Sequence, residues 1–326
     1  MIKGRIAGIG SYVPENVLTN EDLSKLVDTS DEWIYTRTGI SNRRITKEEN
    51  TSDLAAKAAE KALENAKISP LEIDLIIVAT TSPDALTPAT AAIVQNKIGA
   101  KNSACFDVLA ACTGFIYGLK IANSFIKSGD YNNILVIGAE ALSKIIDWKD
   151  RNTCVLFGDG AGAIVLSKTS GDGISSVDIG TDGEKNEYIL CKSHPINNPI
   201  NKVEKDILGK MSMNGKEVFK FAVNIIPRLI NKLLEDNNIK IQELDYIVPH
   251  QANNRIIELA AKKLDVDVDK FYMNLEKYGN TSSASIPLAL DEMNKKGLLK
   301  NGQKLALVGF GGGLTYGSSL IIWNKN

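Results

Sequence analysis

The amino-acid sequence predicts an α/β protein built from two halves of the same plan. Short β-branched and aliphatic runs alternate with longer stretches of helical apolar spacing, a pattern typical of sheets covered by helices. Similar strand-and-loop segments also recur at an offset of 171 residues. In addition, no linker rich in Pro, Gly or Ser divides the 326 residues.

The elements follow from this pattern in chain order. Helical apolar spacing predicts helices over residues 51–66 and 215–234. Apolar runs rich in β-branched residues predict buried strands over 74–79, 133–138, 163–166, 245–248, 304–308 and 319–323. This alternation of strands and helices favours helices packed on the faces of a sheet.

The internal repeat suggests how the halves are arranged. The offset of 171 residues carries Cys112 onto Ser283, and both residues lie in loops of small residues that lead into a helical stretch. We therefore expect residues 1–172 and 173–326 to be equivalent α/β units. Their loops would then face one crevice, where open sheets bind ligands.

Composition excludes several classes of protein. Lys and Arg number 38 and Asp and Glu 39, so no general basic field exists for nucleic acid or an anionic membrane. The first residues lack the apolar run of a signal peptide, and the charge-free segment 305–323 contains five Gly, so no membrane span is expected. The four cysteines show no CxxC spacing, which favours a cytoplasmic protein with reduced thiols. With only two histidines, we expect no metal site.

Cys112 is a candidate nucleophile. It lies in the segment VLAACTGFIYGL, where small residues precede a helical apolar run. A helix N-terminus favours thiolate, the reactive form of cysteine. The alternative is a buried structural thiol, the usual state of a free cysteine. We adopt that alternative for Cys105, Cys154 and Cys191.

Two more polar residues lie where strands or turns end. His250 follows a predicted strand in YIVPHQANNR, and Asn280 lies in KYGNTSSASIP. Each has an ordinary alternative, as a hydrogen-bonded structural histidine and as a turn or N-cap asparagine. The three glycines at 311–313 indicate backbone that approaches a ligand, without the helix that a dinucleotide-binding fingerprint requires.

Motifs along nearly the whole chain point to one family. In order they are GIGSYVPENVLTN, DEWIYTRTGI, the Cys112 segment, FGDGAGA, GKEVFKFAV, PHQANNRI, KYGNTSSASIP and FGGGLTYGS. Together they resemble the thiolase-like condensing enzymes, and specifically the beta-ketoacyl-acyl-carrier-protein synthase III family. The resemblance implies a thiolase-like fold of two pseudo-duplicated α/β halves, layered αβαβα, in a homodimer.

The resemblance also implies a reaction. An acyl-CoA primer condenses with malonyl-acyl-carrier protein to give beta-ketoacyl-acyl-carrier protein, CoA and CO2, which initiates type II fatty-acid synthesis without a metal or cofactor. It implies Cys112 as nucleophile, with His250 and Asn280 as hydrogen-bond donors to the enolate that forms when CO2 leaves. The backbone N–H groups of Cys112 and Gly312 would form the oxyanion hole.

The coenzyme A site is expected on a short helix. Thr29 and Glu32 have the spacing of a capping box that opens this helix, and Gly39 would end it. Trp33 and Arg37 are then i,i+4 neighbours. The resemblance implies that Trp33 and Arg151 hold the adenine ring and that Arg37 helps to hold the nucleotide. The alternative is a surface tryptophan covered by an arginine.

The acyl-carrier protein is expected to dock on a basic surface. Within 253–264, an apolar stripe of helical spacing leaves the charged residues on the outer side. The resemblance assigns carrier binding to Lys220, Arg255, Lys262 and Lys263. An ordinary solvated helix face is the alternative, although a nearly neutral protein needs such a patch to attract an acidic carrier.

One position departs from the family pattern. Thr87 precedes Pro88 where many short-primer members have a Phe that closes the acyl pocket from the partner subunit. We therefore expect a deeper pocket that accepts primers longer than acetyl.

Other functions remain open on the same fold. A close alternative is a secondary-metabolite condensing enzyme or acyltransferase with a different acceptor. A more distant one is a binder of acyl-CoA or nucleotide without catalysis. Elongating relatives are disfavoured, because they use two histidines and His194 lies in the polar segment 192–198.

Overall fold

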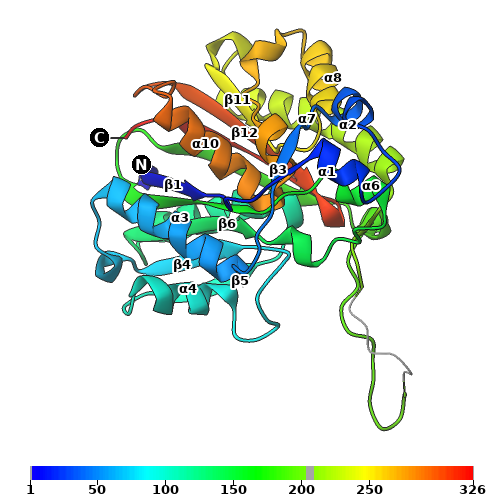
Figure 1. Cartoon of the computed structure of the whole chain (residues 1–326). Coiled ribbons are helices and arrows are strands. Elements are labelled where there is room, and N and C mark those ends of the chain that lie inside the picture. Colours follow the sequence, from blue (N-terminus) through cyan, green and yellow to red (C-terminus); the bar gives the residue numbers. More distant parts are fainter. Residues whose placement is uncertain (1, 203–208, 326) are drawn as a thin grey trace.

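Two β-sheets form the framework of the protein (Figure 1). The computed structural model describes residues 2–202 and 209–325. The first sheet has the order β1-β7-β6-β4-β5 and contains β1 (Lys3–Tyr12), β4 (Leu75–Ala79), β5 (Ala104–Val108), β6 (Asn133–Glu140) and β7 (Gly160–Thr169). The second has the order β11-β12-β13-β8 and contains β8 (Ile174–Thr181), β11 (Tyr246–Pro249), β12 (Lys304–Gly311) and β13 (Thr315–Ile322).

Helices separate and cover the two sheets. The first sheet is covered outside by α3 (Thr51–Ala66) and α4 (Thr90–Ile98). Between the sheets lie α5 (Gly114–Ser128) and α10 (Ser285–Lys295), which contact strands of both. The second sheet is covered by α7 (Gly215–Asn237), against which α8 (Asn254–Leu264) packs. The layered αβαβα arrangement is therefore confirmed.

Apolar burial explains why these segments form the sheets. All five residues of β4 are buried, and β4 pairs in parallel with β5 and β6, as expected for a central strand covered on both faces. Close contact between β1 and α3 depends on glycine. A Cβ at Gly8 would lie 2.3 Å from the Ala62 carbonyl oxygen and one at Gly10 would lie 2.4 Å from the Ala62 nitrogen, so larger residues would push the helix away.

The sequence repeat corresponds to repeated backbone geometry. β6 spans 133–140 and β12 spans 304–311, which is the same length displaced by 171 residues. The helices α5 and α10 begin at Gly114 and Ser285, with the same displacement. Ala111 and Ser282 both adopt left-handed conformations, with φ of 46° and 49°. Both loops thus enter their helices through the same turn.

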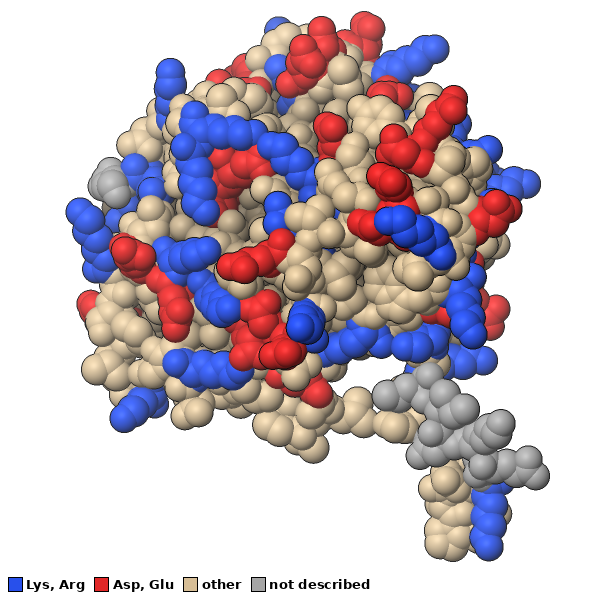
Figure 2. Space-filling model, viewed as in Figure 1, with Lys and Arg blue, Asp and Glu red and all other residues tan. Residues whose placement is uncertain are grey.

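Smaller elements surround the open end of this framework. They are β2 (Val17–Thr19), α1 (Asn20–Ser24), α2 (Asp31–Thr38), β3 (Asn42–Arg44), α6 (Arg151–Cys154), β9 (Ile189–Leu190), β10 (Ser212–Met213) and α9 (Leu275–Tyr278). The segment between β9 and β10 extends away from the body, and Ile200 is 98% exposed. Both signs of charge are interspersed on the face shown in Figure 2, as the net charge of −1 implies.

The expected start of α2 is wrong by one residue. The N-cap is Ser30, not Thr29, because the Ser30 side chain accepts a hydrogen bond from the Trp33 backbone N–H at 3.1 Å. Gly39 ends the helix as expected, with φ of 78°. In the described residues, no helix combines the length and apolarity needed to cross a membrane.

Candidate active site

One large cavity brings together residues from both halves of the chain. Its volume is about 1390 Å³, and its lining residues include Trp33, Arg37, Cys112, Arg151, His250, Asn280 and Gly312. Seven of the predicted site residues thus share a cavity. Five others lie outside its lining: Thr87, Lys220, Arg255, Lys262 and Lys263. Within the described chain, no cluster of three His, Cys, Asp or Glu side chains could hold a metal ion.

Cys112 lies in a tight turn between β5 and α5. The turn is a 3₁₀ segment, Ala111–Thr113, and α5 begins directly after it. The expectation that the helix terminus makes this residue a resting thiolate is wrong. Burial raises the pKa of the Cys112 thiol to about 12, although a hydrogen bond with Ser282 opposes the shift. The resting nucleophile is therefore a protonated thiol.

His250 is held at the end of β11. Its backbone N–H donates to the Val308 carbonyl at 2.8 Å, and its Nδ1 lies 2.8 Å from the Ser285 hydroxyl. The ring packs edge-on against Phe310, with the centroids 5.4 Å apart. Burial lowers the pKa of His250 to about 3. The side chain is therefore a neutral imidazole at physiological pH.

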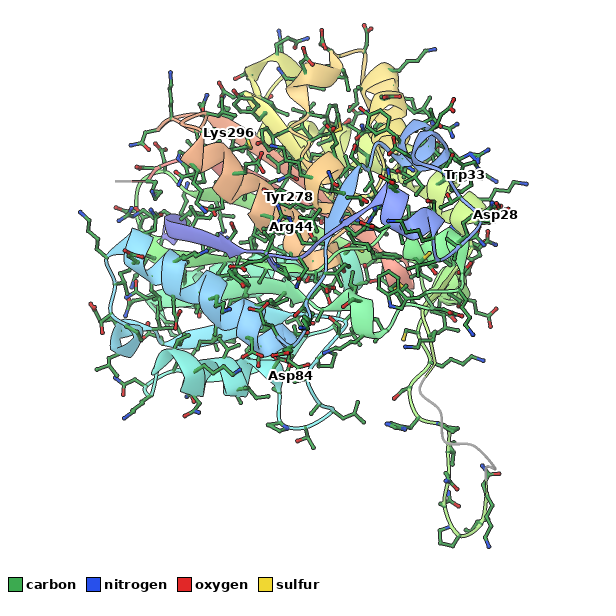
Figure 3. All side chains as sticks on the ribbon, viewed as in Figure 1. Asp28, Trp33, Arg44, Asp84, Tyr278 and Lys296 are labelled. Carbon is green, nitrogen blue, oxygen red and sulfur yellow. The ribbon has the colours of Figure 1, made fainter. Side chains whose placement is uncertain are left out.

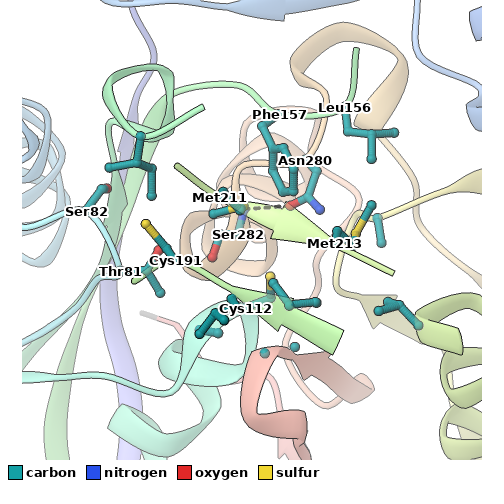
Figure 4. A pocket seen from close by; sticks show the side chains of 18 of the residues that line it. Thr81, Ser82, Cys112, Leu156, Phe157, Cys191, Met211, Met213, Asn280 and Ser282 are labelled. Atoms are coloured by element: carbon teal, nitrogen blue, oxygen red, sulfur yellow. Dashed lines mark hydrogen bonds between the residues drawn. The ribbon is translucent and has the colours of Figure 1, made fainter. Parts of the chain in front are cut away.

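Asn280 is fixed so that its amide can donate. Its backbone N–H donates to the Leu156 carbonyl at 2.8 Å, and its own carbonyl accepts from the Gly158 N–H at 3.0 Å. The Asn280 side-chain oxygen accepts from the Ser282 N–H at 2.8 Å, the bond drawn in Figure 4. Because its oxygen is occupied, the Nδ2 group is the part of this amide available to the cavity.

The glycine-rich loop closes on the nucleophile from the second sheet. A Cβ at Gly311 would lie 2.6 Å from the Cys112 backbone nitrogen, so only a glycine permits this approach. The Thr315 hydroxyl links the two loops, since it lies 3.0 Å from the Ala110 carbonyl and 3.1 Å from the Gly312 carbonyl. The backbones of Cys112 and Gly312 are thereby held beside each other.

A buried carboxylate beside the nucleophile was missed from the sequence. Glu140 ends β6 with an exposed fraction of 0%, and burial raises its pKa. Hydroxyl and backbone groups from the 80–82 loop and from Ser283 surround it. A charged residue at the end of the apolar run ILVIGA was the available signal. The run shows only that the strand ends, not that its last side chain turns inward.

The outer end of the cavity carries a tryptophan between arginines. The guanidinium carbons of Arg37 and Arg151 lie 4.4 Å and 4.7 Å from the Trp33 ring centroid. Arg151 also donates to the Asp28 carbonyl at 2.7 Å, and Figure 3 places Trp33 and Asp28 next to each other at this rim. These contacts make a cationic, aromatic surface suited to a planar ring and its phosphates.

A buried arginine joins this rim to the body. Arg43 donates to the Asn20 side-chain oxygen at 2.8 Å and to the Val155 carbonyl at 2.9 Å. Burial lowers its pKa to about 10. Asn20 in turn donates to Asp31, at the start of α2, at 2.8 Å. The sequence gave no signal for this anchor, which ties α2 to the segment after α6.

The predicted basic residues form a continuous exposed surface on α7 and α8. Lys220, Arg255, Lys262 and Lys263 are all exposed. The two helices pack together, and Lys263 donates to the Asn224 side chain at 2.6 Å. The predicted buried stripe of α8 is confirmed at Ile257, Ala260 and Ala261, whereas Leu264 is only half-buried.

A second exposed feature lies at the edge strand β5. Leu86 and Leu109 are 77% and 79% exposed, and both also line the cavity. Thr87 is exposed in the same loop as Leu86. The apolar side of the cavity therefore opens beside an unpaired sheet edge.

Comparisons with known proteins agree with one family. Residues 106–183 match the model of 3-oxoacyl-(acyl-carrier-protein) synthase III, and residues 234–323 match the model of its C-terminal part. The chain is 59% identical to beta-ketoacyl-(acyl-carrier-protein) synthase III of Clostridium acetobutylicum over 98% of both chains. It superimposes on the crystal structure of 3-oxoacyl-(acyl-carrier-protein) synthase III from Aquifex aeolicus with a TM-score of 0.91 and 47% identity, covering 98% of this chain and 100% of that one. A priming beta-ketosynthase of the R1128 polyketide pathway has the same TM-score at 36% identity, covering 98% and 96%.

Proposed function

The chain belongs to the 3-oxoacyl-(acyl-carrier-protein) synthase III family, and from this premise we propose how its residues divide the reaction. It is an acyltransferase of the condensing type on the thiolase fold, and it catalyses the initiating condensation of type II fatty-acid synthesis. The substrates we propose are an acyl-CoA primer and malonyl-acyl-carrier protein. The products are a beta-ketoacyl carrier protein, CoA and CO2.

Cys112 accepts the primer in the first half-reaction. A thioester exchanges readily with a thiolate, so cysteine is the matched nucleophile. As Cys112 attacks the carbonyl carbon, negative charge develops on the carbonyl oxygen. The N–H groups of Cys112 and Gly312 stabilise that charge, supported by the close approach of the two loops at Gly311. CoA then leaves, and the acyl group stays on Cys112.

His250 and Asn280 serve the second half-reaction. Loss of CO2 from the malonyl thioester leaves an enolate without removal of a carbon-bound proton. The thioester oxygen therefore needs hydrogen-bond donors rather than a base. A neutral imidazole and an amide whose oxygen is already occupied meet this need. This pairing beside a buried cysteine is the observation that carries the proposal. The enolate carbon then attacks the acyl group and releases Cys112.

The two ends of the cavity recognise the two carriers. The Trp33 ring with Arg37 and Arg151 binds the nucleotide of CoA, and adenine enters beside Trp33 when Arg151 moves off the ring. The acyl-carrier protein docks on the basic surface of α7 and α8, formed by Lys220, Arg255, Lys262 and Lys263. Neither step uses a metal or cofactor.

Assembly and primer length depend on the β5 edge. We propose a homodimer formed across this unpaired edge, where Leu86 and Leu109 are largely exposed. Thr87 of one subunit then closes the acyl pocket of the other and leaves room for primers longer than acetyl. We also propose residues 1–172 and 173–326 as duplicated units, and a cytoplasmic location, which suits four unpaired cysteines.

Intact-protein mass spectrometry tests this function. The protein is incubated with acetyl-, butyryl- and octanoyl-CoA, and the adduct is mapped by peptide digestion, with Cys191 as an internal control thiol. Malonyl-acyl-carrier protein is then added. We expect an adduct on Cys112 that discharges to a beta-ketoacyl carrier, and no adduct in Cys112→Ser. Full condensation by Cys112→Ser would refute the assignment of the nucleophile. A strong preference for acetyl-CoA would refute the role of Thr87.

A further inference from the structure

The cradle around Glu140 treats its two oxygens differently. Oε2 accepts from the Ser82 hydroxyl at 2.6 Å, the Thr81 hydroxyl at 3.0 Å and the Thr81 N–H at 3.1 Å. The Ser82 oxygen itself accepts from the Ala141 N–H at 2.9 Å, so its single proton is directed at Glu140. Oε2 is therefore fixed as an acceptor.

The other oxygen has a partner that can either donate or accept. Ser283 lies 3.0 Å from Oε1 and 2.8 Å from the Ala79 carbonyl, but a hydroxyl has only one proton. When Ser283 donates to Glu140, the carboxylate is satisfied. When Ser283 donates to Ala79 instead, its oxygen can accept from a proton carried by Oε1. The cradle thus satisfies Glu140 in both its ionised and its protonated form.

Ser282 connects this cradle to the nucleophile. Its hydroxyl hydrogen-bonds both the Cys112 thiol and the Glu140 carboxyl group, and it is 3% exposed. Moving a proton from Cys112 to Glu140 relocates one negative charge within the buried site. Moving the same proton to His250 would create two new charges there, which burial penalises. The low pKa of His250 is consistent with this penalty.

We propose that Glu140 is a positioning residue that stores the Cys112 proton, through Ser282, for as long as the acyl group is on the enzyme. This inference rests on the proposed function. In acylation, the S–H bond of Cys112 breaks, Ser282 takes that proton and passes its own to Oε1 of Glu140, and the thiolate forms a bond to the acyl carbon. CoA leaves as a thiolate and takes a proton from water. In condensation, Cys112 leaves as a thiolate and recovers its proton from Glu140 by the reverse path.

The charged surroundings of Glu140 suit a single mobile proton. Besides Cys112, Lys144 interacts electrostatically with Glu140. The Lys144 ammonium is anchored elsewhere, to the Pro83 carbonyl at 2.9 Å and the Thr51 hydroxyl at 3.3 Å, and it also interacts with Asp84 and Asp159. Lys144 thus supplies a fixed positive charge rather than a hydrogen bond to the carboxylate.

Proton counting in the first half-reaction tests the proposal directly. The protein is mixed with acyl-CoA alone, in weak buffer with a pH indicator, about one unit or more below the ordinary thiol pKa of ~8.5 so that released CoA is protonated. CoA release and the Cys112 adduct are measured in parallel. We expect one proton taken up from solvent per acylated site. If the Cys112 proton instead leaves with CoA, the uptake is zero, and acylation without uptake overturns the proposal. Absence of both adduct and CoA release would refute the proposed function itself.

Three variants separate proton storage from structural support. Glu140→Gln cannot take the proton, so we expect acylation to slow by about 10²-fold or more, with no uptake at the sites that do react. Glu140→Asp keeps a carboxyl group and should restore the uptake per acylated site. The matched control is Asp159→Asn. Asp159 is a second buried carboxylate with a raised pKa, bonded to Ser143 and Thr46, and its loss should leave one proton per acylated site. Full uptake in Glu140→Gln would overturn the proposal.

Discussion

Raising the pH of the free protein should expose the protonation state of Cys112. Burial moves the pKa of this thiol from 9.0 to about 12, a difference of about three units, or about 4 kcal/mol against forming the thiolate. Below pH 9 the folded site then holds about 10³-fold less thiolate than an ordinary thiol. Only the thiolate reacts with iodoacetamide.

Alkylation with iodoacetamide, followed by peptide mass spectrometry, measures this difference. The rate at Cys112 should rise tenfold per pH unit up to about pH 10 without a plateau, whereas the denatured chain should level off near pH 9. A plateau for the folded protein at or below pH 9 would show that the helix terminus outweighs burial. The comparison would then refute the argument that the thiol is protonated at rest.

The same groups predict how stability changes with pH. His250 has a folded pKa of about 3 against 6.5 in the unfolded chain, so the unfolded state binds more protons between these values. Stability is therefore lost as pH falls from about 6.5 toward 3. The raised pKa of Cys112 has the opposite consequence, since the folded state keeps its proton longer and stability is lost as pH rises from 9 toward 12. In Cys112→Ala, the alkaline loss measured by urea unfolding should be smaller by up to about 4 kcal/mol. An unchanged alkaline loss would contradict this.

Three further substitutions separate the parts of the site. Arg151→Ala removes a cation from the Trp33 ring, so KM for acyl-CoA should rise about tenfold, from roughly 1–2 kcal/mol of lost contact, while KM for the malonyl carrier protein stays constant in initial-rate assays. Asn280→Asp replaces a donor by a carboxylate; single-turnover assays should show acylation retained and condensation reduced by about 10²- to 10³-fold, and equal losses in both would argue against its role. Gly311→Ala places a methyl group 2.6 Å from the Cys112 nitrogen; both half-reactions should fail, and calorimetry should show Tm lowered by a few degrees, as overpacking by about 1–3 kcal/mol implies. A wild-type rate in Gly311→Ala would refute the close approach.

The strands that were predicted are those whose sequence pattern is sufficient by itself. Residues 74–79 form an uninterrupted apolar run and become a central strand buried on both faces. By contrast, β1 was not predicted, because its sequence KGRIAGIGSY contains three glycines. Two of them, Gly8 and Gly10, are needed for the approach of α3. A requirement of tertiary packing therefore concealed the strand from local pattern.

β5 was missed for a related reason. Its sequence ACFDV includes Asp107, whose carboxylate accepts from the Thr90 and Ala91 N–H groups at 2.7 Å and 2.8 Å. The charged residue serves the first turn of α4 rather than the strand. Sequence alone could not assign it, since the helix begins 17 residues earlier.

The site divides in the same way between local and distant information. The placement of Cys112, His250 and Asn280 in one cavity could be predicted, because each follows a strand or turn that opens toward the same crevice. The protonation of Cys112 could not, since it depends on burial by segments far along the chain. Glu140 was missed because its partners come from the 80–82 loop and from Ser283, which only the folded chain brings together.

The two carrier-binding surfaces meet at one junction, and this limits how the substrates can use the site. The side chain of Asn253, at the start of α8, donates to the Arg37 carbonyl at 2.9 Å. Asn254 fills the space beside Gly39, where a Cβ would lie 2.1 Å from its amide nitrogen. The helix with the nucleotide-binding residues and the helix with the carrier-binding lysines thus border the same entrance to Cys112. A CoA nucleotide seated against Arg37 and a carrier docked on α8 would both send their arms through that entrance. Simultaneous binding is therefore excluded sterically, and the acyl group has to wait on Cys112 between the two substrates.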